Sequence, residues 1–447
     1  MNARIATTVW CALLASTLPA ASTASVNPAI APYLSDLREM LRNAEQFTNE
    51  HYVPNDRVGK PFRDKCRETE ARLSGAGSLS EGYVLISDAL LSVDPRIRFY
   101  PPRRPVILDW SWDWQLIGNT AYVCQVDHKG AARDQGLLRG DRILAIEGIP
   151  LNRETYQLAF HLLNTLLAVP GLHVEVQSPE GAPRVLAIPA TQRERRRMRQ
   201  LLQGGRIRLE EDRSEQAEAR REEFFDVQSH IRRQGDVTIW KPLELYRDPS
   251  ALNEAWRLIK GSTNLVVDLR GLLVRDHENV LHTAGYFFSH DVDLGRIDKE
   301  LLDTKLRVKG RDDAFMGNLL VLVNAETAGY SELLAHAIQR EQRGVIVGDR
   351  TMGRVLAEDF FQRSMGSSMG FTSFTVALPA GEVLLADGTR LDGKGVIPDF
   401  QVLPQPADLA GQRDVVLARA LGLLKASLSA EDAYKLFPHY EDEDDEY

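Results

Sequence analysis

Long apolar runs are scarce in this sequence of 447 residues, and none beyond residue 25 is long enough to cross a bilayer. Positive charge is not in excess either, since the formal net charge is −9, and this argues against nucleic acid as a partner. Only three residues are cysteines, and none of them has the spacing of a metal-binding motif. We therefore expect no transmembrane segment beyond the N-terminus, no nucleic-acid partner, no metal and no cofactor.

The few cysteines also limit the covalent cross-links. Cys11 lies in the apolar N-terminal run, whereas Cys66 lies in a helical pattern and Cys124 in a strand pattern. An oxidising compartment permits a disulfide between the last two. Because they lie in different predicted domains, we expect two buried thiols instead.

The N-terminus has the pattern of a secretory signal peptide. A basic residue precedes an apolar run from Ile5 to about Leu18, and small residues follow from Ala20 to Ser25. The apolar run is too short to span a bilayer comfortably, and the small residues offer a cleavage site. We expect residues 1–24 to be removed and the protein to be periplasmic or secreted, with an uncleaved anchor as the alternative.

Helical spacing dominates the segment that follows. Leu34, Leu37, Met40 and Leu41 recur at the positions that line one face of a helix. This pattern predicts an N-terminal helical region over residues 25–105.

Charged residues are concentrated in two other segments. Residues 191–234 are dense in Arg and Glu, with opposite signs at helical spacing, and this predicts a charged helical linker. The mixture of signs favours a solvated helix over a basic surface for acidic partners. At the C-terminus, Glu441 to Glu446 form a run of like charge, so we predict an acidic tail without fixed structure over residues 426–447.

A glycine-containing run marks a further domain. It reads Gly136-Leu137-Leu138-Arg139-Gly140-Asp141, and its glycines suit the left-handed positions of tight turns. With the apolar residues that follow, the run resembles a PDZ domain, which we place over residues 106–190. PDZ domains bind an extended peptide beside a sheet edge and hold its terminal carboxylate with backbone amides. The resemblance implies peptide-binding residues, which are Leu116, Ile117, Gly118, Gly136, Leu137, Gly140 and Asp141.

Alternating strand and helix patterns fill residues 235–425, which predicts a mixed sheet covered on both faces. Four motifs carry a further resemblance: Asp268-Leu269-Arg270-Gly271, Thr327-Ala328-Gly329-Tyr330-Ser331-Glu332, the segment 345–354, and Gly395-Val396-Ile397-Pro398-Asp399. Together they resemble the core of the S41 peptidases, the C-terminal processing proteases. The chain is then expected to be an α+β, multidomain protein with an N-terminal helical region, a PDZ-like β-barrel or sandwich and a ClpP/crotonase-like α/β peptidase core.

The S41 resemblance also shows where the catalytic groups of that family fall on this chain. The nucleophilic Ser falls on Gly329, the Lys base on Arg354 and a supporting Asp on Arg340. In relatives with a Ser-His dyad, the His falls on Arg96. Glycine offers no nucleophile, and a guanidinium group stays protonated at neutral pH. No catalytic group is intact, so we expect a pseudopeptidase.

Other features of the same region fit this interpretation. The oxyanion segment of the family is rich in Gly, whereas this chain has Leu272-Leu273-Val274, whose side chains restrict the backbone. Gly329 remains an acceptable helix N-cap, and Glu332 follows at the capping-box position. Ser331 and Thr327 are weak substitutes for the nucleophile, because a cap or surface role explains each more simply.

The sequence thus predicts an exported S41-like protein that binds peptide or protein C-termini without hydrolysis, as an adaptor or scaffold. Two alternatives stay open: an active serine-type endopeptidase with a rearranged site, and a structural subunit of an envelope complex. The expected partners are peptide or protein C-termini held by the PDZ domain, an active peptidase, or an envelope complex. If the alignment is right, Gly329 and Arg354 face each other across the cleft and are not far apart.

Overall fold

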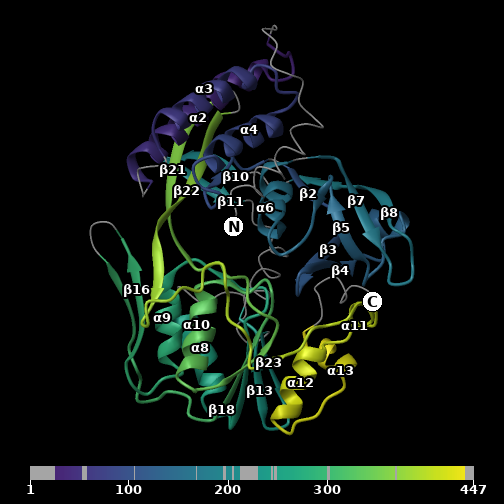
Figure 1. Ribbon diagram of the computed structural model, residues 1–447, viewed down its shortest axis with the longest axis vertical. Coiled ribbons are helices and arrows are strands. Elements are labelled where there is room, and N and C mark those ends of the chain that lie inside the picture. Colours follow the sequence, from purple (N-terminus) through teal and green to yellow (C-terminus); the bar gives the residue numbers. More distant parts are fainter. Residues whose placement is uncertain are drawn as a thin grey trace.

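The computed structural model describes residues 26–52, 58–104, 106–167, 169–194, 198–203, 206–211, 230–242, 245, 249–299, 303–367 and 370–437. The predicted signal peptide, most of the predicted linker and the acidic run at 441–446 lie outside these residues. The described residues form a helical layer, an antiparallel sheet unit and an α/β core, which Figure 1 shows from top to bottom. No helix within these ranges is long and apolar enough to cross a membrane.

The helical layer consists of a 3-10 turn and three helices, which are η1 (Ala31–Tyr33), α2 (Leu34–His51), α3 (Lys60–Leu73) and α4 (Leu79–Leu91). The helical spacing predicted here is confirmed, because Leu34, Leu37, Met40 and Leu41 lie on the buried face of α2. The Ser78 hydroxyl accepts a hydrogen bond from an amide in the first turn of α4 and so caps that helix.

The antiparallel unit is a six-stranded sheet in the order β3-β4-β5-β7-β8, with β6 paired to β5. Its elements are β3 (Trp112–Ile117), β4 (Thr120–Val126), α5 (Ala131–Asp134), β5 (Arg142–Ile146), β6 (Ile149–Pro150), α6 (Tyr156–His161), η3 (Leu162–Leu166), β7 (Gly171–Gln177) and β8 (Arg184–Pro189). Gly136 and Gly140 have φ values of 83° and 87°, so the turns predicted for them are confirmed. Assignment of this unit to the PDZ family stays a prediction.

The helix predicted for the charged segment is wrong where the structure describes that segment. Its described residues form four strands, which are β9 (Thr191–Glu194), β10 (Met198–Gln203), β11 (Arg206–Glu211) and β12 (Ile231–Gln234). Strand β9 pairs with β2 (Val106–Asp109), and β10 pairs antiparallel with β11. In β11, Arg206, Arg208 and Glu210 alternate with Ile207 and Leu209, which is the period of a strand. The scatter of opposite charges concealed this alternation.

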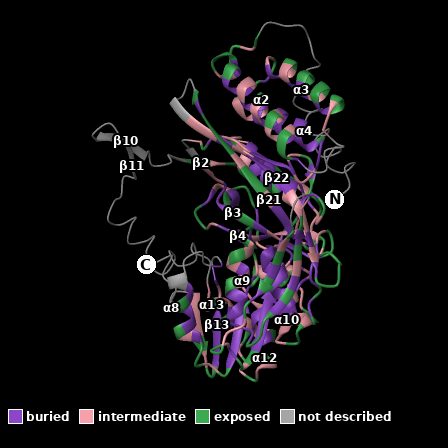
Figure 2. Ribbon diagram, turned by 90° about the vertical axis from the view of Figure 1, so that its left-hand side faces the viewer, coloured by how far each residue is buried: buried purple, intermediate pink, exposed green. Residues whose placement is uncertain are grey.

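The α/β core is built on a sheet in the order β12-β13-β14-β18-β20-β23. Its strands are β12 (Ile231–Gln234), β13 (Val237–Trp240), β14 (Asn264–Asp268), β18 (Asn318–Val323), β20 (Val345–Gly348) and β23 (Phe400–Gln401). All pairs are parallel except β12 with β13. Figure 2 shows buried residues gathered on the strands of this sheet, as expected for parallel strands covered on both faces.

Helices cover both faces of the core sheet. Their bounds are α8 (Pro249–Ile259), α9 (His277–Gly285), α10 (Tyr330–Arg340), α11 (Pro406–Ala410), α12 (Val415–Leu423) and α13 (Ala430–Lys435). The predicted acidic tail therefore begins with structured residues. Ser429 caps α13, and Leu428, Leu436 and Phe437 pack against the core, because this segment still carries apolar side chains at helical spacing.

A second sheet joins the helical layer to the core. It contains β1 (Arg98–Tyr100), β16 (Val292–Asp298), β17 (Thr304–Val308), β21 (Leu356–Ser367) and β22 (Gly370–Leu385). In Figure 1 the long β21–β22 hairpin runs from the core to α2. Phe361 in β21 stacks on Phe47 and His51 of α2, with ring centroids 5.7 Å and 4.3 Å apart.

Candidate active site

Gly329 lies in a position that excludes a side chain. It ends the short strand β19 (Ala328–Gly329), which pairs with β15 (Leu273–Val274), and it is the N-cap residue of α10. Its backbone has φ 72° and ψ −143°, a conformation that L side chains rarely adopt. A Cβ atom here would lie 2.1 Å from the carbonyl oxygen of Val274. The position at which the S41 resemblance places the nucleophile therefore holds only the backbone.

Arg354 lies beside Gly329, as the alignment requires. The Gly329 amide donates a hydrogen bond of 2.9 Å to the carbonyl oxygen of Arg354. The guanidinium of Arg354 does not bond to Gly329 but pairs with Glu358 at 3.1 Å. The two substituted catalytic positions are thus neighbours, and neither offers a proton acceptor.

Glu332 fixes the segment that carries Arg354. Its carboxylate accepts hydrogen bonds from the Thr351 hydroxyl at 2.5 Å and from the amides of Gly353 and Arg354 at 2.7 Å and 2.8 Å. Burial raises the pKa of Glu332 to about 7, although these donors act in the opposite direction. The sequence predicted Glu332 as a helix cap. It did not indicate that the Glu332 carboxylate joins α10 to the segment 351–354, which precedes β21.

The other two substituted positions differ in their surroundings. Arg96 pairs with buried Asp94 at 2.8 Å and lies 4.0 Å from Asp392. Arg340, at the end of α10, donates to the carbonyl oxygen of Asp293 at 2.6 Å and pairs with the next residue, Glu341. None of these contacts of Arg340 involves a residue around Gly329, so the structure does not bring Arg340 into the cleft.

The hydroxyls of the two weak substitutes are buried and bonded to the backbone. The Ser331 hydroxyl is fully buried and donates toward the carbonyl oxygens of Leu272 and Ala328, at 2.8 Å and 2.7 Å. The Thr327 hydroxyl is also fully buried and donates to the Leu269 carbonyl at 2.9 Å. Each hydroxyl is held by backbone acceptors rather than by a general base, so neither is activated.

The segment expected to form the oxyanion hole is closed. The Gly271 amide donates to the side chain of Asn324 at 2.9 Å, and the Leu272 amide donates to the Leu269 carbonyl at 3.1 Å. The Leu272 carbonyl in turn accepts from Ala328 at 3.1 Å. These amides are used within the protein and do not point at a developing charge.

Three of the predicted peptide-binding residues lie at the end of β3, where backbone amides already contact carboxylates of the core. The Leu116 amide donates to Glu326 at 3.0 Å, and the Gly118 amide donates to Asp349 at 2.6 Å. The Tyr156 hydroxyl also donates to Glu326. Burial raises the pKa of Glu326 to about 7, and the nearby Asp113 carboxyl adds to the shift. Ile117, between the two amides, is buried.

The remaining predicted peptide-binding residues shape a turn instead. Leu137 is fully buried, and Asp141 accepts from the Leu138 amide at 3.1 Å and from Arg184 at 2.6 Å. A Cβ on Gly140 would lie 2.5 Å from the carbonyl oxygen of Pro406 in α11. Gly136 supplies the left-handed turn before β5. These side chains lie within the fold rather than along a free groove.

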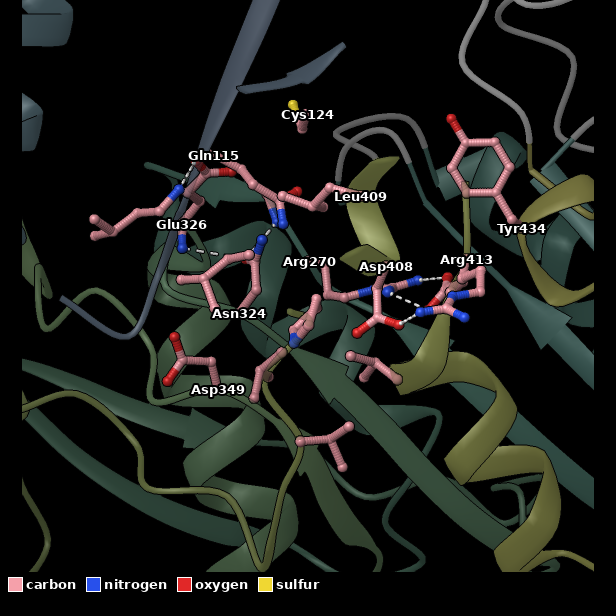
Figure 3. Close-up of a pocket in the computed structure, with 18 of the residues that line it drawn as sticks. Gln115, Cys124, Arg270, Asn324, Glu326, Asp349, Asp408, Leu409, Arg413 and Tyr434 are labelled. Carbon is pink, nitrogen blue, oxygen red and sulfur yellow. Dashed lines mark hydrogen bonds and ion pairs between the residues drawn. The ribbon is translucent and has the colours of Figure 1, made fainter. Parts of the chain in front are cut away.

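A cavity of about 260 Å³ lies between β3, the core sheet and the C-terminal helices (Figure 3). Most of the charged residues that line it are paired. Arg270 bonds to Asp268 and Asp414 at 2.7 Å, Arg413 bonds to Asp408 at 2.6 Å, and Asp349 lies 3.4 Å from Arg153. Lys241 and Glu326 also line the cavity, and neither forms an ion pair with another described residue. Both described cysteines are free thiols: Cys66 is buried, and Cys124, which lines this cavity, is partly buried.

Sequence reasoning missed three charged residues beside Gly329. Arg98, Arg275 and Glu358 come from segments far apart in the chain and meet only in the folded protein. Arg275 lies 3.3 Å from Glu358, which also pairs with Arg354. Strand β1, which contains Arg98, has only 3 residues, so its sequence pattern did not indicate that Arg98 is buried.

Comparison with known proteins agrees with the arrangement of the core. Residues 237–402 match the model of peptidase family S41. This part of the chain belongs to peptidase family S41. The carboxyl-terminal-processing protease of Synechocystis sp. is 28% identical over 185 residues, which cover 38% of this chain and 39% of that relative. The chloroplastic C-terminal processing peptidase of Tetradesmus obliquus is 39% identical over 95 residues, which cover 21% of this chain and 19% of the relative.

A solved structure also shares the fold of this chain. Mature CPAF superimposes with a TM-score of 0.56 at 11% identity, covering 84% of this chain and 94% of the other. The sequence matches span less than two fifths of the length of these curated relatives. The relatives are named as processing peptidases, and these names describe the relatives rather than this chain.

Proposed function

We propose that this protein is a pseudopeptidase of family S41 that binds polypeptide C-termini without cleaving them. One observation carries the proposal. At the nucleophile position, Gly329 has no side chain, and the carbonyl of Val274 occupies the space that a side chain would need. The permanently cationic Arg354 lies at the position of the base.

Two further features support loss of hydrolysis rather than relocation. The hydroxyls of Ser331 and Thr327 are bonded to backbone carbonyls, and the amides of Gly271 and Leu272 are used within the protein. Acyl transfer needs a nucleophile, a base and an oxyanion hole. Each of the three is altered in a different way.

The protein is proposed to act in the periplasm or outside the cell, as an adaptor or scaffold. The N-terminal pattern and the antiparallel unit, which resembles a PDZ domain, support this part. An active peptidase or an envelope complex is the proposed partner.

The competing proposal is an active serine-type endopeptidase with a rearranged site, which membership of a peptidase family favours. Incubation of the full chain with a denatured polypeptide, followed by mass spectrometry and a binding measurement, decides between the two. We expect binding with every peptide recovered intact. New peptide ends that appear with turnover would show that the proposal is wrong.

A further inference from the structure

One face of the sheet formed by β1, β22 and β21 carries charged residues beside the altered catalytic positions. Strand register places Arg98 opposite Ala377 and Ala377 opposite Phe360, so these three residues share a face. Because residues two apart on a strand point to the same side, Tyr100 and Glu358 lie on this face as well. Figure 1 shows this part of the sheet between the helical layer and the core.

Arg98 is a buried cation that lacks an anionic partner. Its residue is 3% exposed, and among the described residues no carboxylate lies within ion-pair distance of its guanidinium. It donates to the carbonyl oxygens of Pro95 and Ile97 at 2.7 Å and 2.9 Å, and its Nε has no partner. Burial and then the neighbouring Arg354 lower the pKa of Arg98 to about 10, so it is still charged at neutral pH. A buried charge without a counter-ion is costly, and a bound anion relieves that cost.

Two further guanidinium groups share a single carboxylate. Arg354 lies 3.1 Å and Arg275 lies 3.3 Å from the two oxygens of Glu358, whose side chain is buried. Together with Arg98, these three guanidinium groups have Glu358 as their shared carboxylate. The nearby Arg96 pairs with Asp94 and lies 4.0 Å from Asp392, which also interacts with Arg354. Four positive charges therefore face three negative charges, which leaves a surplus of one.

The aromatic neighbours hold this cluster in place without adding charge. The guanidinium of Arg275 lies 5.9 Å from the ring centre of Tyr100 and 5.8 Å from that of Phe360. His161 packs edge-on against Tyr100 at 5.2 Å. Burial and the nearby Arg98 lower the pKa of His161 to about 3, so its ring is neutral. The positive surplus therefore remains.

The cluster opens to solvent beside apolar side chains. Phe360 is 47% exposed and Leu273 is 41% exposed. Leu273 belongs to β15, and its Cδ1 lies 3.2 Å from the place that a Cβ of Gly329 would take. A ligand that combines an anion with an apolar group would satisfy both features of this surface.

We propose that this surface is an anion site that binds the C-terminal carboxylate of a peptide through Arg98, Arg275 and Arg354. The last side chain of the peptide contacts Leu273 and Phe360. A carboxylate accepts charge-assisted hydrogen bonds from guanidinium groups, often two from one arginine. This inference rests on the proposed function, because the bound peptide is not cleaved. It adds that the C-terminus of the peptide lies at the altered catalytic cleft.

The test compares two forms of one peptide on the full chain. A fluorescently labelled hexapeptide with an apolar last residue is titrated as the free acid and as the C-terminal amide, and anisotropy gives the affinity. We expect the free acid to bind at least tenfold more tightly than the amide. Equal affinity for the two forms would overturn the proposal.

Variants then assign the contact to the cluster. Arg275→Met should weaken binding of the free acid about tenfold and leave binding of the amide unchanged. Glu358→Gln should strengthen binding of the free acid, because a competing carboxylate is removed. Arg307→Met, which changes an exposed arginine of β17, serves as the matched control. No effect of Arg275→Met on the free acid would contradict the assignment.

Two more measurements separate the ligand classes and the two proposals. Inorganic phosphate and an amidated peptide with an internal Glu are tested as competitors of the labelled free acid. If either competes as well as the unlabelled free acid, the site binds anions in general and the peptide assignment is overturned. Mass spectrometry of the same mixtures reports cleavage. Cleaved peptide would refute the proposed function, whereas the ratio of acid to amide affinity would still decide the anion site.

Discussion

At Gly329, a backbone conformation and a neighbouring carbonyl group independently oppose a side chain. The positive φ of 72° favours glycine over every other residue, and the Val274 carbonyl lies 2.1 Å from the Cβ position. A side chain at this position would therefore require β15 to shift. A serine placed here would not by itself create a catalytic site.

Gly329→Ser is expected to destabilise the protein by about 2–4 kcal/mol without restoring hydrolysis. Urea denaturation and a peptidase assay measure the two effects. Gly422→Ser is the matched control, because Gly422 lies in α12 with open space around its Cβ position and should change stability little. Wild-type stability together with peptide cleavage in Gly329→Ser would contradict this account.

Glu326 gives the protein a pH dependence at the contact between β3 and the core. Its folded-state pKa of about 7 is above the usual value for Glu, so the folded state binds the proton more tightly. The resulting stabilisation is complete below about pH 4.5 and is lost as the pH rises through about 7. Glu332 adds a contribution of the same sign.

Glu326→Gln should remove part of this pH dependence, worth up to about 3 kcal/mol between pH 5 and pH 8. Urea denaturation at several pH values measures the slope. Glu382→Gln, at an exposed glutamate, should leave the profile unchanged. A Glu326→Gln profile as steep as that of the wild type would show that Glu326 does not titrate in this range.

Among the elements, α12 is joined to the core by a buried network of charges. Arg270 bonds to Asp268 at the end of β14 and to Asp414, the N-cap residue of α12. The Asp414 carboxylate also accepts from the Leu417 amide at 2.9 Å. One arginine thus positions the helix that covers one face of the core sheet.

Arg270→Met is expected to lower the free energy of unfolding by about 3–5 kcal/mol, because two carboxylates lose their cation. The triple variant with Asp268→Asn and Asp414→Asn should recover much of that loss. Thermal unfolding of both variants measures the difference. A triple variant less stable than Arg270→Met would contradict the electrostatic explanation.

Some elements were predictable from local pattern and others were not. The apolar strand at Asn264–Asp268 and the motif around Gly329 have patterns that match the folded core. The strands at Met198–Gln203 and Arg206–Glu211 were predicted as helix, because charged residues of both signs fit the helical spacing as well as the spacing of a strand. Local sequence also left the whole of α13 within a predicted tail.

At the scale of the whole molecule, the β21–β22 hairpin carries contacts on its two faces. Phe361 stacks on α2 in the helical layer, whereas Phe360 faces the cluster of Arg98 and Arg275. The positions that align with the catalytic residues of the S41 peptidases could be located from the sequence, since they follow from a linear motif. The buried cluster was not, because its members come from β1, β21 and the loop after β15, and only the fold brings them together.

Phe361→Ala should loosen the helical layer and lower stability by about 2 kcal/mol. Hydrogen exchange measured by mass spectrometry is expected to quicken in α2 while the core sheet keeps its protection. Phe360→Ala changes the neighbouring residue on the opposite face and serves as the control. Equal exchange in α2 for both variants would show that this stacking does not hold the layer.

The absence of an activated nucleophile is tested most directly by intact-protein mass spectrometry after exposure to a fluorophosphonate. The account predicts that the mass of the full chain stays unchanged while an active serine peptidase in the same tube is labelled. A stoichiometric adduct that maps to Ser331 or Thr327, and disappears in Ser331→Ala or Thr327→Ala, would contradict it.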